Sequence, residues 1–335
     1  MSITIKDIAT LAGVSYSTVS KALNNSPLVK SETKEKIIKI AEELGYEPNF
    51  AAQRLVSKHS KTIGVIWPTV ERMAPSSLVT KINEIVKKNN YQMLLSIDTI
   101  KNSLETFKKF QVDGVIVFDE QEDEPIAALA KGLPVVSYGV GQDEDEYPII
   151  DVNYQGAMKT AVNYLHQLGH KHIAFVGDFS PIDNRQFEKY KGFLKAMEEL
   201  GLPVTRNHLI NTAGLEWLDG YSAVNRMLQS AAPVPTAIIG ASYDISSGIV
   251  RALREADFTI PKDISVIGYD NIPQMANLEV PLTSVGVPVQ SIADRLVHTL
   301  IDCIHGQYKP EQDGPLKPVL TERNSCAQAR KIQGV

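Results

Sequence analysis

The stretch TIKDIATLAGVSYSTVSKALN, residues 4–24, decides the fold of the first part of the chain. Apolar side chains recur in its first half at the spacing of an amphipathic helix, at Ile5, Ile8, Ala9 and Ala12. Thr4 is a suitable N-cap for this helix, and Gly13 ends it. Ser15 is a good N-cap for a second short helix, whose i, i+4 apolar pair is Val19 and Leu23. Two short helices joined by so tight a turn predict a helix-turn-helix.

A third helix is predicted after the helix-turn-helix. Ser31 is its expected N-cap, Glu32 lies at the positive end of its dipole, and Gly45 ends it. Its apolar face consists of Ile37, Ile38, Ala41 and Leu44. Three helices give a minimal core, so residues 1–47 are expected to form an all-α helix-turn-helix head.

Residues 48–60 are predicted to form a short helix and a linker. Pro48 can begin a helix, and helix formers follow it at Ala51, Ala52, Gln53, Arg54 and Leu55. So short a helix is unstable alone in water, and we expect it to fold only against a partner. Residues 57–61 are polar and basic, as is typical of a linker.

The charge of the chain is unevenly distributed. The net charge is −5, but residues 1–61 carry nine basic and six acidic side chains, a balance of +3, which leaves −8 for the remainder. Phosphate binding draws on clustered Lys and Arg side chains. A basic head on an acidic body is typical of a DNA-binding module joined to a separate regulatory domain.

The composition excludes several classes of protein. With 335 residues, of which 43% are hydrophobic and 22% charged, the chain is neither disordered nor a disulfide-rich miniprotein. Apolar runs such as residues 63–67 are far shorter than the ~20 residues of a membrane span. No apolar signal-peptide core follows Met1, so we expect a cytoplasmic protein without a membrane segment. Cys303 and Cys326 are then expected to be free thiols.

The remaining residues, 61–335, alternate short apolar strands with helical patterns, which is typical of parallel α/β sheets. A first series of strands is expected at residues 63–67, 91–95, 115–118 and 135–138, and a second at 173–176, 237–240 and 266–269. The expected fold class is therefore a small all-α helix-turn-helix head plus an α/β body of two doubly wound parallel-sheet subdomains. Ligands bind such sheets at the carboxyl ends of the strands, so the facing loops are expected to frame one cleft.

The head resembles the N-terminus of the LacI/GalR family of bacterial repressors. The matching residues are Thr4 to Ala9, Ala12 to Ser15, Thr18 to Ser20, Leu23-Asn24, Leu44 to Tyr46 and Pro48-Asn49. The resemblance implies that the second helix reads the major groove of operator DNA, with Tyr16, Ser17 and Lys21 facing base edges. It implies phosphate-positioning roles for Ser15, Thr18, Asn24 and Tyr46.

The same resemblance gives the segment after the head a role on DNA. Residues 49–56 match a hinge helix that folds in the minor groove of the bound double-stranded operator. Its expected DNA-binding residues are Asn49, Ala52 and Leu55. Leu55 would be an apolar wedge between base pairs, because an exposed Leu on a marginal helix packs poorly but can stabilise a bent duplex.

The resemblance extends over the body, which in this family looks like a periplasmic sugar-binding protein with three crossings between subdomains. The matching residues are Asp151 to Gly156, Leu168 to Lys171, Ile264 to Asp270, Pro281 to Thr283 and Glu322 to Ser325. It places an N-subdomain at about 61–160 and 290–320 and a C-subdomain at about 161–288 and 321–330. The chain has no room for an additional tetramerisation helix after these residues. We therefore expect a homodimer, whose two-fold axis would match a palindromic operator.

Asp270, expected directly after the strand at 266–269, is the best candidate for binding an effector. The resemblance implies that this aspartate binds hydroxyl groups of the ligand. A structural cap on the next loop is its alternative. The other candidate effector-binding residues are Lys189, Arg185, Trp67, Tyr138, Ser242 and Tyr243.

Several of these positions depart from the pattern of the family. Ser242 and Tyr243 replace a common Asn-Asp pair, Lys189 replaces an arginine, and Gly139 replaces an acid. Lysine lacks the planar fork of arginine, so the usual contacts to a monosaccharide are weakened. Arg185 and Lys189 would also suit a phosphate or carboxylate. A sugar, a sugar phosphate or a glycoside is the expected effector.

The sequence gives no sign of an enzyme, because neither a phosphate-binding loop nor a Gly-x-Ser-x-Gly elbow occurs. No cofactor is expected, and no metal, because His170 and His172 lack a third ligand. The prediction is a sequence-specific repressor of a carbohydrate-related operon, controlled allosterically by a small molecule. Two alternatives stay open: a cytoplasmic small-molecule binding protein, and a regulator controlled mainly by a protein corepressor such as a phosphorylated carrier.

Overall fold

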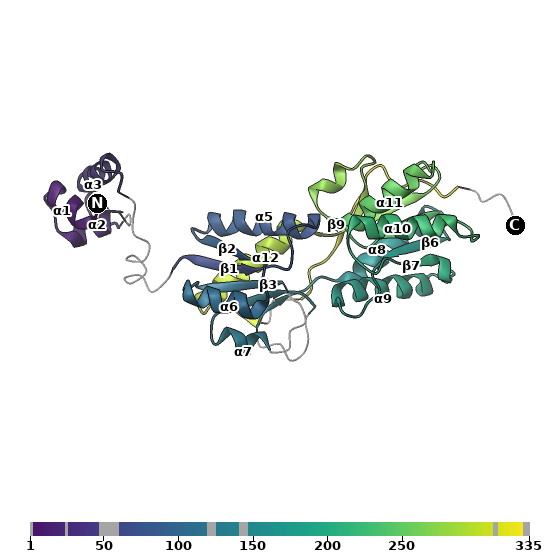
Figure 1. Cartoon of the computed structure of the whole chain (residues 1–335), viewed down its shortest axis with the longest axis horizontal. Coiled ribbons are helices and arrows are strands. Elements are labelled where there is room, and N and C mark those ends of the chain that lie inside the picture. The colour runs from purple at the N-terminus through teal and green to yellow at the C-terminus, as the bar shows by residue number, and fades with distance from the viewer. Residues whose placement is uncertain are drawn as a thin grey trace. The chain divides into compact units, whose positions relative to one another are not determined.

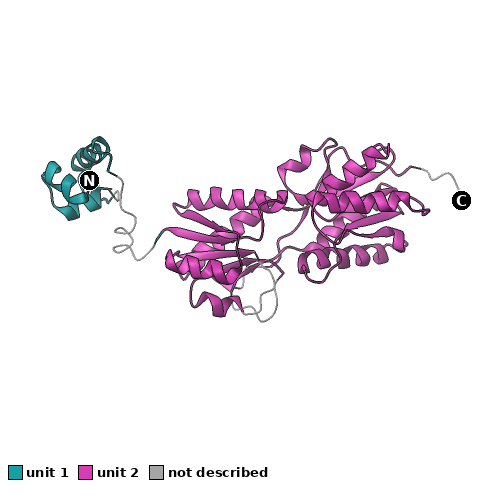
Figure 2. Cartoon of the chain, in the orientation of Figure 1, with its two compact units in different colours: residues 1–60 teal, residues 61–335 magenta. Residues whose placement is uncertain are grey.

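The computed structural model describes residues 3–23, 26–46, 60–118, 125–140, 147–310 and 314–330. The chain divides into two compact units, residues 1–60 and residues 61–335 (Figure 2). The hinge helix predicted over residues 49–56 lies outside the described residues. The same holds for four predicted DNA-binding residues, Asn24, Asn49, Ala52 and Leu55.

The first unit is the predicted three-helix head. Its helices are α1 (Ile5–Ala12), α2 (Tyr16–Leu23) and α3 (Ser31–Glu43). The turn between α1 and α2 depends on Gly13, whose φ of 70° is in the left-handed region that favours glycine. The helices meet in a core of Ile8, Ala12, Val19, Ala22, Ile37 and Ala41. The helix-turn-helix prediction is confirmed.

Local hydrogen bonds explain where the head helices begin. The Thr4 hydroxyl donates to the Asp7 carboxylate over 2.7 Å, and these bonds with Thr4 lower the pKa of Asp7. Ser15 Oγ accepts the Thr18 backbone N–H over 3.2 Å, as expected of an N-cap. Ser31 differs from the prediction, because it is the first residue of α3 and Lys30 holds the N-cap position.

The N-subdomain of the second unit contains a five-stranded, fully parallel sheet in the order β2-β1-β3-β4-β5. Its strands are β1 (Thr62–Ile66), β2 (Gln92–Ser96), β3 (Gly114–Phe118), β4 (Val135–Tyr138) and β5 (Ile149–Ile150). Its helices are α5 (Met73–Lys88), α6 (Ile100–Lys109), α7 (Ile126–Ala130) and α12 (Val289–Ile304). Although α12 is late in the chain, it lies against α5 in this lobe (Figure 1).

The C-subdomain contains a six-stranded sheet in the order β11-β10-β9-β8-β6-β7. Its strands are β6 (Ile173–Gly177), β7 (Leu209–Asn211), β8 (Ala237–Gly240), β9 (Ser265–Asn271), β10 (Thr283–Pro288) and β11 (Val319–Thr321). Its helices are α8 (Tyr154–Gln167), α9 (Asn184–Glu199), α10 (Trp217–Gln229) and α11 (Tyr243–Glu255), with short 3₁₀ turns at Arg206–His208 and Pro273–Ala276. The edge strand β11 pairs antiparallel with β10, while all other pairings in this sheet are parallel, and the predicted fold class is confirmed.

The chain passes three times between the two subdomains. The first passage is at Asp151–Asn153, where Val152 pairs with Leu316 of the third passage, and the second is at the junction of β10 and α12. The first passage is one helix earlier than the boundary expected near residue 160, because the whole of α8 packs against α9 in the C-subdomain. Paired extended segments therefore connect two lobes that each have their own sheet.

The strands are apolar because the helices cover both faces of the sheets. Every residue of β1, β3 and β6 is buried, in agreement with the continuous apolar runs that predicted these strands. The carboxyl end of β3 in one lobe and those of β8 and β9 in the other lie at the space between the lobes, where Phe118, Ser242 and Asp270 are found. The fold thus places the functional candidates at strand ends.

Gly192 sets how closely α9 approaches α8. A Cβ atom added at Gly192 would lie 2.6 Å from the backbone Cα of Gln155, a separation that real Cβ atoms do not show. Because backbone atoms cannot move aside as a flexible side chain can, the close packing of these two helices depends on a glycine at this position.

We expect Gly192→Ala to lower the free energy of unfolding by about 1–3 kcal/mol, the usual cost of overpacking a tight contact. Urea denaturation of the full chain measures this change. Gly314→Ala is the matched control, because an added Cβ at Gly314 meets nothing within 4 Å. Equal stabilities of the two variants would contradict the prediction.

Candidate functional site

The surface of α2 presents three of the residues predicted to read DNA. Tyr16 is 51% exposed, and Ser17 and Lys21 are exposed as well. Val19 and Ala22 are buried in the head core. Because Ser17 and Lys21 are four residues apart, they share one face of the helix. This face has an aromatic ring, a hydroxyl and a cation available for a partner.

The predicted phosphate-positioning residues of the head have different surroundings. Ser15 is exposed and its Oγ lies 2.8 Å from Thr18 Oγ1, so the two hydroxyls are hydrogen-bonded to each other. Tyr46 is half-buried against the head core. Lys36 has a structural contact, because its Nζ donates to the Ala12 carbonyl oxygen over 3.1 Å and so joins α3 to the end of α1.

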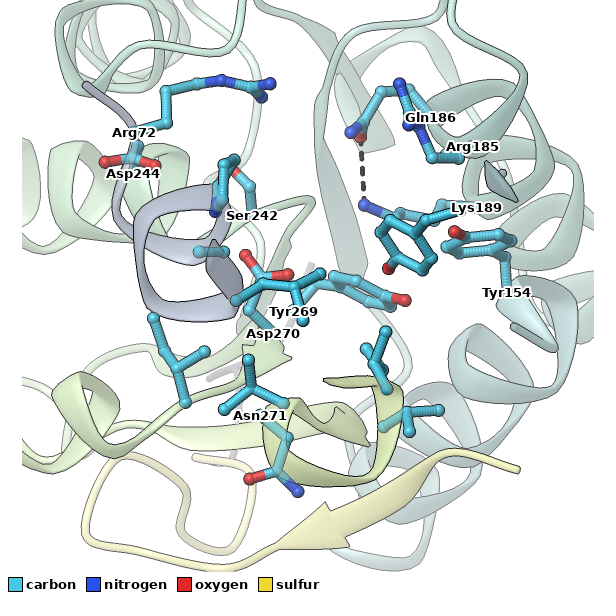
Figure 3. Close-up of a pocket in the computed structure, with 18 of the residues that line it drawn as sticks. Arg72, Tyr154, Arg185, Gln186, Lys189, Ser242, Asp244, Tyr269, Asp270 and Asn271 are labelled. Atoms are coloured by element: carbon cyan, nitrogen blue, oxygen red, sulfur yellow. Dashed lines mark hydrogen bonds between the residues drawn. The ribbon is translucent and has the colours of Figure 1, made fainter. Parts of the chain in front are cut away.

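A cavity of about 690 Å³, part of it open to solvent, lies between the lobes of the second unit (Figure 3). The N-subdomain contributes Arg72, Ala74, Pro75, Leu78, Phe118, Tyr138 and Ile292 to its lining. The C-subdomain contributes Tyr154, Asp183, Arg185, Gln186, Lys189, Ser242, Asp244, Tyr269, Asp270, Asn271 and Ile272, and the junction of the subdomains contributes Val287 and Val289. This mixture of apolar and polar groups is typical of a small-molecule site.

Asp270 lines the cavity and also caps a helix. It lies within β9, because this strand continues for two residues beyond its predicted end at residue 269. The backbone φ of Asp270 is 86°. Its Oδ2 accepts the Tyr243 backbone N–H at the start of α11 over 2.9 Å. Burial raises the pKa of Asp270, while the Lys189 cation opposes this rise. The capping alternative and a place in the cavity are therefore compatible.

Lys189 is an almost fully buried cation at the cavity wall. Its Nζ donates to the Ala241 carbonyl oxygen over 2.9 Å and to Gln186 Oε1 over 3.3 Å, and it lies 3.8 Å from the centroid of the Tyr269 ring. Burial lowers the pKa of Lys189 to about 8, although Asp270 and Asp183 favour its charged form. Lys189 therefore remains mostly protonated at pH 7.

Arg185 is the second cation that α9 presents to the cavity. Its Nε donates to Asp183 Oδ1 over 3.1 Å, and its guanidinium carbon lies 3.7 Å from the centroid of Phe118. Phe118 ends β3 in the N-subdomain, so this cation–π contact joins the two lobes. Although burial alone would raise the pKa of Asp183, Arg185 and Lys189 hold it below its ordinary value.

Tyrosine rings form much of the remaining polar surface. Burial raises the pKa of Tyr138 to about 12, and it raises the pKa values of Tyr154 and Tyr269 well above the ordinary value. These three hydroxyls are therefore neutral at pH 7 and are groups that can hydrogen-bond a ligand.

Two predicted effector-binding residues do not line the cavity. Trp67 is fully buried and packs behind it, edge-on to Phe118 at 4.7 Å and stacked on Tyr138 at 6.5 Å between ring centroids. It directly follows β1, a strand in which every residue is buried. Tyr243 contributes its backbone N–H to Asp270, but its ring is not part of the lining. The structure brings together the other five: Arg185, Lys189, Tyr138, Ser242 and Asp270.

Several lining residues were missed by the sequence reasoning. Gln186 lies between two predicted residues on α9, Tyr269 precedes Asp270, and Asp244 follows Ser242, so proximity to predicted strand ends would have found these three. Arg72 is a different case, because it precedes α5 and no local pattern in the sequence indicates its direction.

Asp244 makes a hydrogen bond across the cavity. Its carboxylate oxygens lie 3.3 and 3.5 Å from the backbone nitrogen of Met73, the first residue of α5 in the other lobe. A carboxylate at the N-terminus of a helix is stabilised by the free N–H groups there. Burial, together with the nearby Asp270, nevertheless raises the pKa of Asp244 from 3.8 to about 6.

A carboxyl group whose pKa is raised in the folded protein favours the protonated folded state. It therefore lowers stability at pH values above its folded pKa, and this cost disappears as the pH falls toward the unfolded value. For Asp244 the relevant pH window lies between the ordinary pKa of 3.8 and the folded-state pKa of about 6.

We expect Asp244→Asn to unfold with a free energy about 1 kcal/mol higher than the parent at about pH 7.5. The asparagine oxygen can still accept the Met73 N–H, and the gain is limited because solvent screens this partly exposed group. At about pH 4.5 the difference should shrink toward zero, since the parent carboxyl is then mostly protonated. Urea denaturation at both pH values tests this, with the exposed Asp302→Asn on α12 as control.

A three-helix head with an exposed second helix, joined to a two-lobed body with a polar cavity, defines a class: a regulator in which a ligand-binding body is attached to a DNA-binding helix-turn-helix. Residues 4–49 match the family described as "Bacterial regulatory proteins, lacI family". Residues 162–326 match the "Periplasmic binding protein-like domain". The chain belongs to the lacI family of bacterial regulatory proteins.

Comparisons over the full chain agree with this assignment. The chain is 31% identical over 299 residues to catabolite control protein A of Priestia megaterium, covering 87% of this chain and 90% of the relative. It is 31% identical over 332 residues to the HTH-type transcriptional repressor PurR of Pasteurella multocida (strain Pm70), covering 96% and 98%. The crystal structure of the Lac repressor dimer bound to operator and the anti-inducer ONPF superposes with a TM-score of 0.83 at 25% identity, covering 98% of this chain and all of that one.

These findings settle the broad function. The protein is a DNA-binding transcriptional repressor with a ligand-binding body, and its relatives are regulators and not enzymes. In the described part of the chain, no helix is both long and apolar enough to cross a membrane.

Proposed function

We propose that this repressor binds a pseudo-palindromic operator as a homodimer, controls a carbohydrate-related operon, and is regulated by a small-molecule effector in the cavity between its lobes. The observation that carries the proposal is the cavity itself, which is lined by charged and aromatic side chains from both lobes. The structure of the similar Lac repressor, a dimer on its operator with a small molecule bound, supports the dimer and the operator. Because operator DNA lies in the bacterial cytoplasm, the proposed place of action is cytoplasmic.

The effector would act by changing how the lobes close. Arg185 contacts Phe118, and Asp244 contacts Met73, only while the lobes are together. A ligand between the lobes alters the balance between the closed and open states of the body. Only one of these states would align the two heads of the dimer on an operator. A coupling of roughly 1–3 kcal/mol would change operator affinity by about 5–150-fold.

On DNA, α2 would enter the major groove. Tyr16, Ser17 and Lys21 would then contact base edges, while Ser15, Thr18 and Tyr46 would position the phosphates. The roles proposed for Asn24, Asn49, Ala52 and the wedge Leu55 follow from the resemblance, and these residues lie outside the described part of the chain.

We expect Lys21→Gln to weaken operator binding by about tenfold, and to weaken binding to unrelated duplex much less, because a lost base contact removes specificity. Fluorescence anisotropy at fixed salt measures both affinities on duplexes tiled around the protein's own gene. Lys39→Gln is the matched control, because it removes the same charge from an exposed position on α3. Equal losses in the two variants would indicate a purely electrostatic role for Lys21.

We expect Asp270→Asn to reduce the effector response at least about tenfold while operator affinity without effector stays unchanged. Asparagine tolerates the left-handed backbone of this residue and can still accept the Tyr243 N–H, so the cap is kept and the charge is lost. The readout is the shift in operator anisotropy caused by a panel of sugars, sugar phosphates and glycosides. A full response in the variant would show that another residue anchors the effector.

The competing function, a regulator controlled mainly by a protein corepressor, predicts a different result in the same assay. Operator binding would then respond to a phosphorylated carrier protein and to no small molecule. The cavity, lined by charged side chains from both lobes, favours the small-molecule effector.

A further inference from the structure

Arg185, in the cavity wall, has a buried nitrogen without an acceptor. Its Nη1 makes no hydrogen bond to any described residue. The neighbouring Asp183 accepts Arg185 Nε and the backbone N–H groups of Arg185 and Gln186 at Oδ1, but it does not accept a hydrogen bond from Nη1. Native proteins seldom leave a buried charged donor unpaired, since its lost hydration is then uncompensated.

Lys189 is a second cation with a hydrogen-bond donor that no described residue accepts. Lys189 is one helical turn from Arg185 on α9, and Figure 3 shows both side chains on the same side of the cavity. Its ammonium group has three protons, of which Ala241 and Gln186 accept two. One wall of the cavity therefore offers donors that carry positive charge.

The opposite side of the cavity offers acceptors. Asp270 and Asp244 lie there with Ser242, on β9 and α11 (Figure 3). Each of the two carboxylates accepts one backbone N–H and has further lone pairs for ligand hydroxyls. The rings of Tyr138, Tyr154 and Tyr269 complete the lining, with faces suited to the apolar side of a sugar ring.

We propose that the effector is a hydroxylated organic anion whose oxyanion group is held by Arg185 and Lys189 and whose hydroxyl groups face Asp270. This inference rests on the proposed function of the cavity. A carboxylate or phosphate accepts charge-assisted hydrogen bonds from both cations, and these bonds are shorter and stronger than those that a neutral hydroxyl accepts. Arg185 is then the residue that determines specificity for the anion.

The test measures binding by isothermal titration calorimetry to the full chain. The probes are hexuronates such as D-glucuronate, aldonates such as D-gluconate, and aldose phosphates such as D-glucose 6-phosphate. Each anion is paired with its neutral parent sugar, and D-glucuronate is also paired with the uncharged D-glucuronamide of nearly the same shape. Comparison of the hexuronates and aldonates with the aldose phosphates shows whether the bound oxyanion is a carboxylate or a phosphate.

We expect at least one anion to bind about tenfold or more tightly than its neutral partner. Arg185→Gln should remove this preference, and Arg185→Lys, which keeps the charge but not the fork, should retain part of it. Lys195→Gln on the exposed side of the same helix is the control and should keep the full preference. Thermal unfolding of each variant checks that it is folded.

Three results would overturn the proposal: neutral sugars bind as tightly as the anions, the preference survives in Arg185→Gln, or no anion of the panel binds. Operator anisotropy on the same preparations separates this failure from failure of the proposed function. If a neutral compound shifts operator affinity, the cavity is an effector site and only the anion proposal is wrong. If no compound shifts it and operator binding is also absent, the proposed function itself fails.

Discussion

The compensation of charges buried between the two lobes is the constraint on which the functional part of this structure depends. Lys189 and Arg185 lose most of their hydration on α9, and Asp183 and Asp270 hold them in place by charge. Such an arrangement is costly unless each charge has partners. Backbone groups at helix and strand ends hydrogen-bond Asp183, Lys189 and Asp270, whereas Arg185 Nη1 has no partner among the described residues.

The same charges connect the cavity to movement. The contacts that cross from lobe to lobe include the Arg185 guanidinium on Phe118 and the Asp244 carboxylate at the start of α5, and both Arg185 and Asp244 line the cavity. The lobes are also joined by the passages of the chain, two of which pair through Val152 and Leu316. A ligand that binds these charges therefore acts on the contacts that keep the lobes together.

Elements with a local signal were predictable. The head was found from Gly13 and the apolar spacing around it, and β1, β3 and β6 were found from apolar runs. Elements whose stability is tertiary were not: β11 is a three-residue edge strand that exists through pairing with β10, and α8 resembles any amphipathic helix until its packing on α9 assigns it to a lobe. Trp67 shows the same limit, because a strand-end aromatic can face a cavity or pack behind it.

The sequence by itself determined the helix-turn-helix, the two α/β series, the family, and five cavity residues, because periodicity, caps and motifs are properties of neighbouring residues. Only the tertiary structure decided that Arg72 reaches the cavity, that Asp244 contacts the start of α5, and that Arg185 has a buried, unpaired nitrogen among the described residues. The physical reason is that partners such as Asp244 and Met73 are far apart in sequence. Their contact depends on how two separately folded sheets face each other, which no local pattern encodes.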